Sequence, residues 1–280
     1  PLEEPSPAAP RPAIPEPDAT IKHDPRDLDT NEVPSALPDF ATAKKKAVDA
    51  ELKNLEVERS KKAKFIMECD AVLRRFLKAR TLEERLPFMT KSRRSDAELK
   101  ASSLAGSLPN YTPVGPEDFF RPKGRARSSY HTVIFEYLEK EERNQMMTFR
   151  LVSFAEGEAP RVQTDVFLDL FENVPGKLAE KPIKGPITMN VIIQTSTYCF
   201  VDEVPDADSK ATISIRSSVK GSRKDLAQAF LRADSDLSKK LRAHVPAGTS
   251  APVTLSLEWN IKEDPKRPYL EVARLNAMSW

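Results

Sequence analysis

Proline is distributed unevenly along this chain of 280 residues, and its distribution limits what each part can fold into. Ten of the 24 prolines fall within residues 1–39, where large apolar side chains are scarce and nine acidic residues face three basic ones. A segment of this composition cannot bury enough apolar surface to offset the entropy lost on ordering. Residues 1–39 are therefore predicted to be a disordered, acidic, Pro-rich linker, which could also serve as a docking ligand.

Residues 40–80 contain neither proline nor glycine and are predicted to form one long helix. Its first part is polar, with a thin apolar stripe of Ala47, Leu52 and Leu55. From Phe65 onward, apolar residues recur at helical spacing. The pattern predicts a projecting polar helix over residues 40–64 that enters a core in its second half.

Two capping patterns follow the long helix. The Thr81 hydroxyl can accept from the amide of Glu84, while the Glu84 carboxylate reaches back to the amide of Thr81. Ser95 and Glu98 repeat this spacing and predict a further short helix. Residues 109–124, with several prolines and glycines, are predicted to be a loop.

The apolar period then changes from that of a helix to that of a strand. Residues 131–138 and 146–154 alternate and are predicted to form an antiparallel hairpin. A third strand is expected at residues 162–166. A short helix is expected around Phe167, ended by Pro175 and Gly176.

Pro182, Gly185 and Pro186 mark the predicted boundary of a second domain. The elements expected after it are strands at residues 187–200 and 211–215, a helix from Ser222 through Ala233 that continues or restarts at Ser235, and strands at 253–259 and 269–280. This order of strands, helix and two strands suits a small α+β sandwich or a partly open five-stranded barrel, and periodicity does not choose between them.

The fold class predicted from these patterns is α+β. The expected organisation is the linker at residues 1–39, the polar helix at 40–64, an α+β domain at 65–183 and a small α+β domain at 184–280.

Two motifs carry a resemblance to a known family. The segment Phe76–Pro87 reads FLKARTLEERLP and precedes Arg93 and Arg94, and the chain closes with a strand pair that ends in Trp280. This pattern resembles a bacterial family of uncharacterised activity that is often membrane-anchored behind a Pro-rich linker.

The resemblance covers residues 65–280 and implies an architecture without an activity. The implied first domain is a cone of helices and a curved antiparallel sheet, similar to nuclear-transport-factor-like (NTF2-like) or SnoaL-like proteins. The chain departs from the family at Asp165, which is followed by Val166 where such proteins often carry Trp. Because the sequence starts at Pro1 without an initiator Met, an anchoring helix or signal is expected upstream. The expected location is the bacterial cell envelope, with the cytoplasm as the alternative.

Neither a cofactor nor a metal site is predicted. The histidines His23, His131 and His244 have no Cys, His or carboxylate at ligand spacing, and no phosphate-cradling glycine motif is present. Cys69 and Cys199 each lie in an apolar run and are predicted to be buried thiols.

A cone could hold a small ligand at its mouth, lined by Tyr130, His131, Tyr137 and Asp165. Such a group could supply a general base and a tyrosine donor. The alternative, which we favour, is that these residues make ordinary hydrogen bonds at a strand end.

A basic run of Arg121, Lys123, Arg125 and Arg127 could contact phosphate groups of nucleic acid or anionic lipid. The net charge of only +2 and the lack of interleaved aromatic residues favour a solvated loop instead.

The function predicted from the sequence is therefore a non-enzymatic binding or scaffolding module. The 40–64 helix is the expected element for a protein partner or for self-association. The alternatives are a small-molecule-binding or catalytic cone and a weak nucleic-acid or lipid binder.

Overall fold

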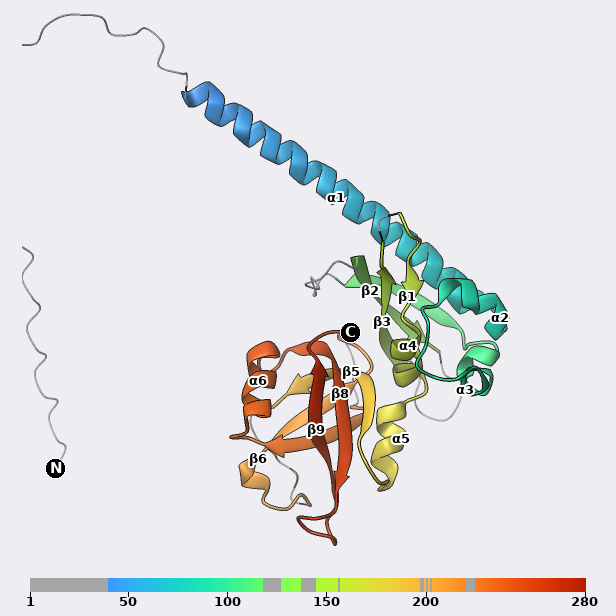
Figure 1. The fold of residues 1–280 in the computed structure, drawn as a ribbon, viewed down its shortest axis with the longest axis vertical. Coiled ribbons are helices and arrows are strands. Elements are labelled where there is room, and N and C mark those ends of the chain that lie inside the picture. Colours follow the sequence, from blue (N-terminus) through green and yellow to red (C-terminus); the bar gives the residue numbers. More distant parts are fainter. Residues whose placement is uncertain are drawn as a thin grey trace, which may run out of the picture. The chain divides into compact units, whose positions relative to one another are not determined.

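A computed structural model describes residues 40–117, 127–136, 145–155, 157–196, 199, 201, 203–219 and 225–280. The predicted linker at residues 1–39 lies outside these residues, as do residues 139–144, which are predicted to form the turn of the hairpin. The described part combines helices with two separate sheets, which confirms the predicted α+β class (Figure 1). Internal contacts divide the chain into two units, residues 1–53 and 54–280.

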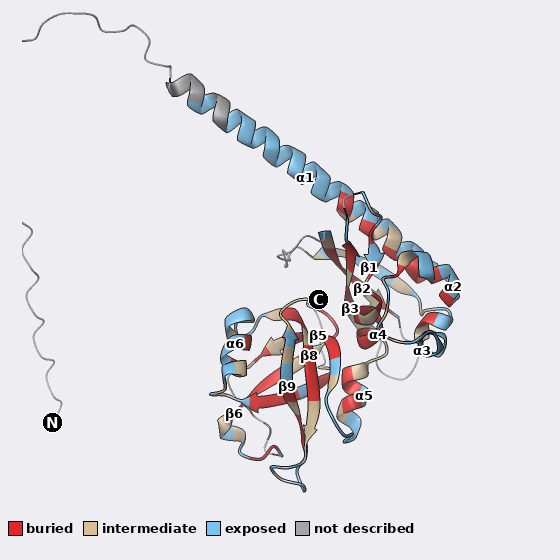
Figure 2. Ribbon diagram, viewed as in Figure 1, coloured by how far each residue is buried: buried red, intermediate tan, exposed pale blue. Residues whose placement is uncertain are grey.

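The long helix is present and spans Phe40–Lys78 (α1). Its residues 40–53 are the only described part of the first unit, and the side chains of 48–53 are all exposed. In the second unit α1 stays exposed up to Lys64 (Figure 2). Phe65, Cys69, Leu73 and Phe76 are then buried at intervals of four, four and three residues, so that one helix face enters a core as predicted.

The corner after α1 is closed by a short helix at Leu82–Arg85 (α2) and a 3-10 turn at Leu86–Phe88 (η1). The Glu84 amide donates to the Thr81 hydroxyl at 3.2 Å, but the Glu84 carboxylate accepts from the amide of Arg80 at 2.6 Å. The predicted capping box is therefore wrong in its second half, by one residue.

Fully buried Arg85 closes the C-terminal end of α1. Its guanidinium donates to the main-chain oxygens of Phe76 at 3.3 Å, of Ala79 and of Leu104. The bonds to Phe76 and Ala79 satisfy carbonyls that the end of a helix leaves without partners, and the bond to Leu104 ties this end to a later segment. The complete capping box of Ser95 and Glu98 then starts Asp96–Lys100 (α3) as predicted, followed by a 3-10 turn at Ser103–Ala105 (η2).

The first sheet has four antiparallel strands in the order β1-β2-β3-β4. They are Tyr111–Glu117 (β1), Arg127–Phe135 (β2), Gln145–Ser153 (β3) and Arg161–Val162 (β4). The predicted hairpin is confirmed as the β2–β3 pair. The predicted loop at 109–124 is wrong where β1 forms. An edge strand tolerates proline because one side of its backbone needs no partner, and Gly115 has a positive φ of 126° at a register shift.

Two helices follow this sheet, Thr164–Phe171 (α4) and Val174–Glu180 (α5). The expected strand at 162–166 is wrong beyond Val162, because α4 begins at Thr164. Pro175 and Gly176 start α5 and do not end a helix. Asn173 caps α5 from a left-handed conformation by accepting from the Gly176 amide at 3.1 Å, and proline is well tolerated in a first helical turn.

Aromatic side chains form the core between α1, α4 and the first sheet. The Phe167 ring meets Phe76 edge-on at 4.9 Å and Phe149 at 5.0 Å, and Phe135 packs against Phe171 at 5.0 Å. These contacts join the helical face of α1 to the sheet through α4.

The second sheet is a closed five-stranded barrel in the order β5-β6-β7-β9-β8. Its elements are Ile187–Thr195 (β5), a 3-10 turn at Ala207–Ser209 (η3), Lys210–Arg216 (β6), Ala227–Arg232 (β7), a helix at Asp236–His244 (α6), Ser250–Asn260 (β8) and Tyr269–Ala277 (β9). Strands β7 and β9 pair in parallel, and the other pairs are antiparallel. This connectivity, with the helix between the third and fourth strands, is that of an OB-fold barrel. Of the two predicted architectures, the barrel is the one present.

The predicted helix at residues 222–233 is wrong, because residues 227–232 form β7. Ala227, Ala229 and Leu231 point into the barrel core, whereas Gln228 and Arg232 are exposed. This alternation is that of a strand, but alanine and leucine also favour helices, which concealed it in the sequence. The restart at Ser235 is confirmed as the N-cap of α6.

The barrel and the first sheet share buried residues. Ile192 of β5 and Trp280 lie in the same hydrophobic cluster as Phe149. The Trp280 indole donates to the main-chain oxygen of Val191 at 3.1 Å, while the Tyr130 hydroxyl donates to the main-chain oxygen of Trp280 at 3.2 Å. Both sides of the predicted boundary at Pro182–Pro186 therefore contribute to one core.

The aromatic core generates a first prediction. Replacing Phe76 by Ala removes a fully buried ring and should lower the free energy of unfolding by about 3–5 kcal/mol. Met67→Ala on the same helix is the matched control, because Met67 is 73% exposed. Urea denaturation of the full chain measures both, and equal midpoints for the two variants would contradict the packing described above.

Candidate functional site

The three described residues of the predicted cone pocket, Tyr130, His131 and Asp165, do not converge. Tyr130 and His131 are consecutive on β2 and therefore point to opposite faces of the sheet. The Tyr130 ring lies 5.7 Å from Trp280, whereas the Nε2 of His131 lies 3.0 Å from the Ser129 hydroxyl. Tyr137 lies outside the described residues.

Asp165, the fourth predicted residue, is in the first turn of α4 and serves a local role. Its carboxylate accepts from the Ser92 hydroxyl at 2.5 Å and from the amide of Arg93 at 3.2 Å. It thereby holds the segment before α3 against α4.

The face of the first sheet that a cone would use for a ligand is filled with side chains. Phe135, Phe149 and Leu151 are fully buried there. The Phe135 and Phe149 rings pack at 6.1 Å, and each also contacts a phenylalanine of α4. Along this face of the described sheet, packed side chains fill the space that a ligand pocket would need.

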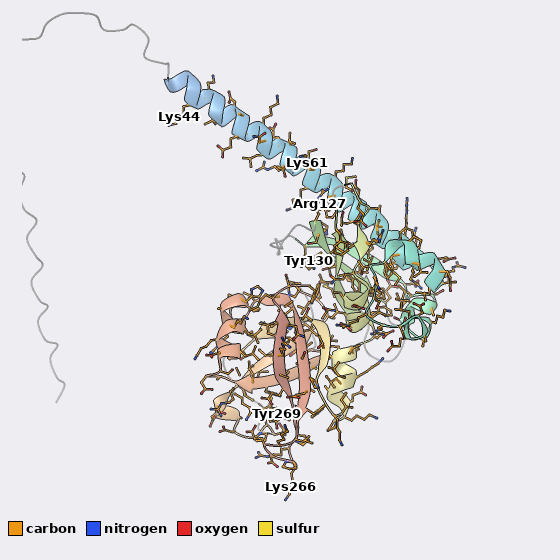
Figure 3. The ribbon with its side chains drawn as sticks, in the orientation of Figure 1. Lys44, Lys61, Arg127, Tyr130, Lys266 and Tyr269 are labelled. Carbon is orange, nitrogen blue, oxygen red and sulfur yellow. The ribbon has the colours of Figure 1, made fainter. Side chains whose placement is uncertain are left out.

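The predicted basic run is described at one position only. Arg121, Lys123 and Arg125 lie outside the described residues. Arg127 stacks over the Phe65 ring at 4.3 Å and donates to the main-chain oxygen of Lys61 at 3.3 Å (Figure 3). This guanidinium holds β2 against α1.

A dense polar cluster joins the segment before α3 to α4. Asp165, Asp169 and Glu172 follow one another at intervals of four and three residues and so share one side of α4. Arg93 contacts Asp169 at 2.5 Å, and Arg94 contacts Glu172 at 2.6 Å. Each arginine thus has a carboxylate partner.

Asp169 is the centre of this cluster and only 3% exposed. Besides Arg93, it accepts from the main-chain amide of Asn190 at 2.8 Å and from its side chain at 2.9 Å. Burial raises the pKa of Asp169, while the bonds from Asn190 and the charge of Arg93 act to lower it. Because Asn190 is on β5, this carboxylate links the first domain to the barrel.

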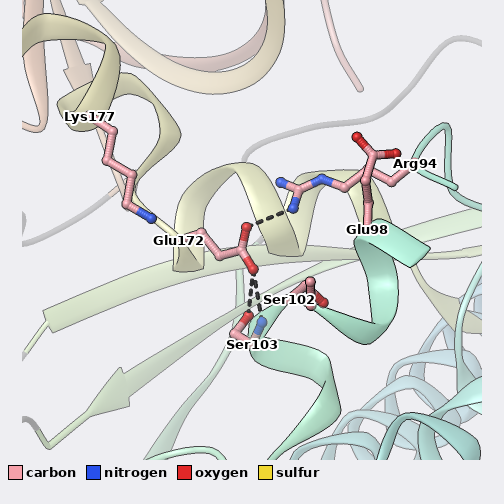
Figure 4. A pocket seen from close by; sticks show the side chains of 7 residues that line it. Arg94, Glu98, Ser102, Ser103, Glu172 and Lys177 are labelled. Atoms are coloured by element: carbon pink, nitrogen blue, oxygen red, sulfur yellow. Dashed lines mark hydrogen bonds and ion pairs between the residues drawn. The ribbon is translucent and has the colours of Figure 1, made fainter. Parts of the chain in front are cut away.

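A shallow, open depression of about 530 Å³ lies beside this cluster (Figure 4). Its lining residues are Arg94, Glu98, Ala101, Ser102, Ser103, Glu172 and Lys177. Glu172 accepts from the amide of Ser103 at 2.9 Å as well as from Arg94. Burial acts to raise the pKa of Glu172, but hydrogen bonds from Arg94 and Ser103 outweigh it and hold the pKa below its usual value. A carboxylate held ionised in this way is a poor general base at neutral pH.

The barrel offers a second candidate, because OB-folds bind ligands on their second and third strands and the adjoining loops. Here the corresponding face of β6 and β7 carries Phe230, which is buried against Val204 and Tyr269. Cys199 and Val201 pack on the same cluster. The chain therefore covers part of this face with its own loop.

The described cysteines are both free thiols. Cys69 is buried as predicted, and burial raises its pKa to about 12. Cys199 is half-buried. Among the described residues, no group of three or more His, Cys, Asp and Glu side chains is placed to hold a metal ion.

Sequence reasoning missed Asp169, Glu172 and Asn190. A usable signal was present in the spacing of three carboxylates along an otherwise apolar helix, matched by the pair Arg93–Arg94. The spacing of residues could not predict that Asn190, in the barrel, donates hydrogen bonds to the carboxylate of Asp169.

Comparisons with protein-family models, with curated proteins and with solved structures found no match to this chain. The resemblance to cone-like bacterial proteins therefore stays a prediction. No helix within the described ranges is both long and apolar enough to cross a membrane.

The environment of His131 predicts a pH dependence of stability. Burial lowers the pKa of His131 from 6.5 to about 4, against a smaller opposing effect of Asp70. The folded chain therefore favours neutral His131, and its contribution is complete above pH 6.5 and lost as the pH falls toward 4. Between pH 7.5 and 5 the loss should be roughly 2 kcal/mol.

Urea denaturation at these two pH values measures this loss. It should shrink in His131→Gln and persist in His244→Gln, which changes an exposed histidine. An identical pH slope in the wild-type chain and His131→Gln would contradict the assignment.

The carboxylate of Asp169 predicts a stability effect of its own. Asp169→Asn removes the charge that Arg93 contacts and an acceptor that Asn190 uses, so the free energy of unfolding should fall by about 1–3 kcal/mol. Asp234→Asn, at an exposed residue that pairs with Arg232, is the matched control and should change it far less. If the two variants unfold at the same denaturant concentration, Asp169 does not link the domains as inferred.

Proposed function

We propose that this chain is a non-enzymatic binding module whose helix α1 pairs with an acidic, amphipathic helix of a partner protein. The observation that carries this proposal is a row of exposed apolar side chains on α1. Val48, Leu52 and Leu55 are 47%, 54% and 50% exposed and follow one another at intervals of four and three residues. Such spacing places apolar groups on one side of a helix, where a second helix can cover them.

The net charge of the same segment indicates the charge that a partner surface should carry. Residues 44–64 carry eight basic and four acidic residues. This surplus attracts an acidic surface and opposes pairing with a second copy of the same segment. We therefore choose a partner helix with acidic flanks over self-association.

The catalytic alternative has less support. Phe135, Phe149 and Leu151 occupy the sheet face that a cone would leave open. Of the two carboxylates that line the surface depression, Glu172 is paired with Arg94, and Glu98 accepts from Ser95 in a helix cap. Both observations favour a role in binding over one in catalysis.

The nucleic-acid or lipid alternative also has less support. It rests on Arg121, Lys123 and Arg125, which lie outside the described residues, and on Arg127, which stacks on Phe65. No described observation favours it over helix pairing.

A peptide titration tests the proposal. The probes are two synthetic amphipathic helices with the same leucine stripe, one flanked by glutamates and the other by lysines. Fluorescence anisotropy with the full chain should show saturable binding of the acidic peptide only. The double variant Leu52→Ser/Leu55→Ser should weaken it at least about tenfold, since burying two leucines contributes several kcal/mol.

Val57→Ser is the matched control, because Val57 is 47% exposed but lies two residues beyond Leu55, on another side of α1. Its affinity should equal that of the wild-type chain. Equal binding of both peptides, or no loss in the double variant, would overturn the proposal. A sedimentation mass of twice the chain that depends on Leu52 would show self-association instead.

A further inference from the structure

Three buried polar atoms without a hydrogen-bond partner belong to side chains on one face of the first sheet. They are Ser128 Oγ, Arg150 Nε and Gln163 Oε1, and the described residues contain only one other such atom, Ser238 Oγ. Because nearly all buried polar atoms in folded proteins have partners, three together call for an explanation.

The strand register brings these side chains to the same face. Arg150 lies directly opposite Tyr130, and Ser128 is two residues before Tyr130 on β2. On the other side of β3, the amide of Gln163 donates to the main-chain oxygen of Arg150 at 2.9 Å. Arg150 therefore lies between the other two, with Ser128 diagonally across from it on β2 and Gln163 beside it just after β4.

Arg150 differs from Arg85, Arg93 and Arg94. Arg93 and Arg94 contact carboxylates, and buried Arg85 donates to three main-chain oxygens. Within the described ranges, the side chain of Arg150 has neither a hydrogen bond nor an ion pair, and its guanidinium lies 5.9 Å from the Tyr130 ring.

The surroundings of Arg150 disfavour its charge. Burial lowers the pKa of Arg150, and no carboxylate contributes to raising it. A half-buried cation without an anion is an unfavourable arrangement that binding of an anion would relieve.

We propose that Ser128, Arg150 and Gln163 form a binding site for a small oxyanion, a phosphate or carboxylate group. The planar guanidinium presents two N–H groups whose spacing matches two oxygens of such a group. The Ser128 hydroxyl supplies a further donor. A half-turn of the Gln163 carboxamide directs its NH2 group to the place where Oε1 now lies, so that all three side chains donate.

The Tyr130 ring supports this arrangement from the side. It lies under the guanidinium and is itself fixed by its hydroxyl bond to Trp280 and by ring contact with the indole. Arg150 as a whole is only half-buried, although its Nε atom is covered. This site is independent of the proposed pairing of α1.

The test compares salts at equal ionic strength. Thermal unfolding of the full chain is measured in sodium chloride, in inorganic phosphate and in acetate. The midpoint of the wild-type chain should rise saturably with phosphate, with acetate or with both, because an anion that binds only the folded state stabilises it. Comparing the two oxyanions shows which group the site prefers.

Arg150→Met should abolish this rise. Its dissociation constant for the preferred oxyanion, measured by titration calorimetry, should be at least about tenfold higher than that of the wild-type chain. Arg161→Met is the matched control, since exposed Arg161 lies on the next strand and pairs with Glu158 at 3.3 Å, and it should keep the response. In chloride alone, Arg150→Met should be at least as stable as the wild-type chain, because it removes a half-buried charge that has no anionic partner.

The proposal is overturned if the wild-type midpoint is the same in all three salts, or if both variants respond alike. Should Arg150→Met fail to fold, Arg150→Lys provides the second measurement. Lysine keeps the positive charge but lacks the paired N–H groups of the guanidinium, so the affinity of this variant for the oxyanion should be reduced. An affinity for the oxyanion equal to that of the wild-type chain would contradict the proposed site.

Discussion

The packing of Trp280 into the first core is the interaction on which the arrangement of the second unit depends. The residue follows the last barrel strand, yet its side chain lies in the cluster of α1, α4 and the first sheet, and its indole donates to Val191 of β5. Because Trp280 contacts both sheets, it fixes the position of one relative to the other. Two further bonds follow the same boundary, from Asn190 to Asp169 and from the amide of Thr148 to the main-chain oxygen of Ser217. The bond from Thr148 to Ser217 gives a partner to a part of β3 that the short strand β4 does not reach.

Most polar side chains at this boundary are paired with other groups of the chain. The carboxylates of α4 bind arginines and Asn190, so they hold elements together and are not free to act on a ligand. Buried charge is tolerable when partners are present, and the structure provides them for Arg85 and Asp169. Two features remain outside this scheme, the exposed apolar row on α1 and the guanidinium of Arg150. Function is most reasonably sought where a chain leaves apolar or charged groups without internal partners.

Periodicity predicted the elements whose side chains all obey one spacing. The helix through Phe65 and Phe76 was foreseen because one of its faces is apolar, and the β2–β3 hairpin because both strands are rich in residues that favour strands. The failures occur where residue preference and environment disagree. Residues 227–232 consist largely of good helix formers but lie in a barrel, and the prolines of β1 are accommodated because β1 is an edge strand. Of the candidate site residues, Tyr130 and His131 were placed together although consecutive strand residues face opposite ways.

The sequence by itself determined the α+β class, the extent of the long helix, the caps at Ser95 and Ser235 and the scarcity of metal-ligating patterns. These follow from local spacing and backbone preference, which act over a few residues. Only the tertiary structure decided that five strands close into a barrel, that Asp169 meets Asn190 and that Arg150 has no carboxylate beside it. Such relations join segments distant in the chain, and they depend on strand register and burial, which no short stretch of sequence specifies.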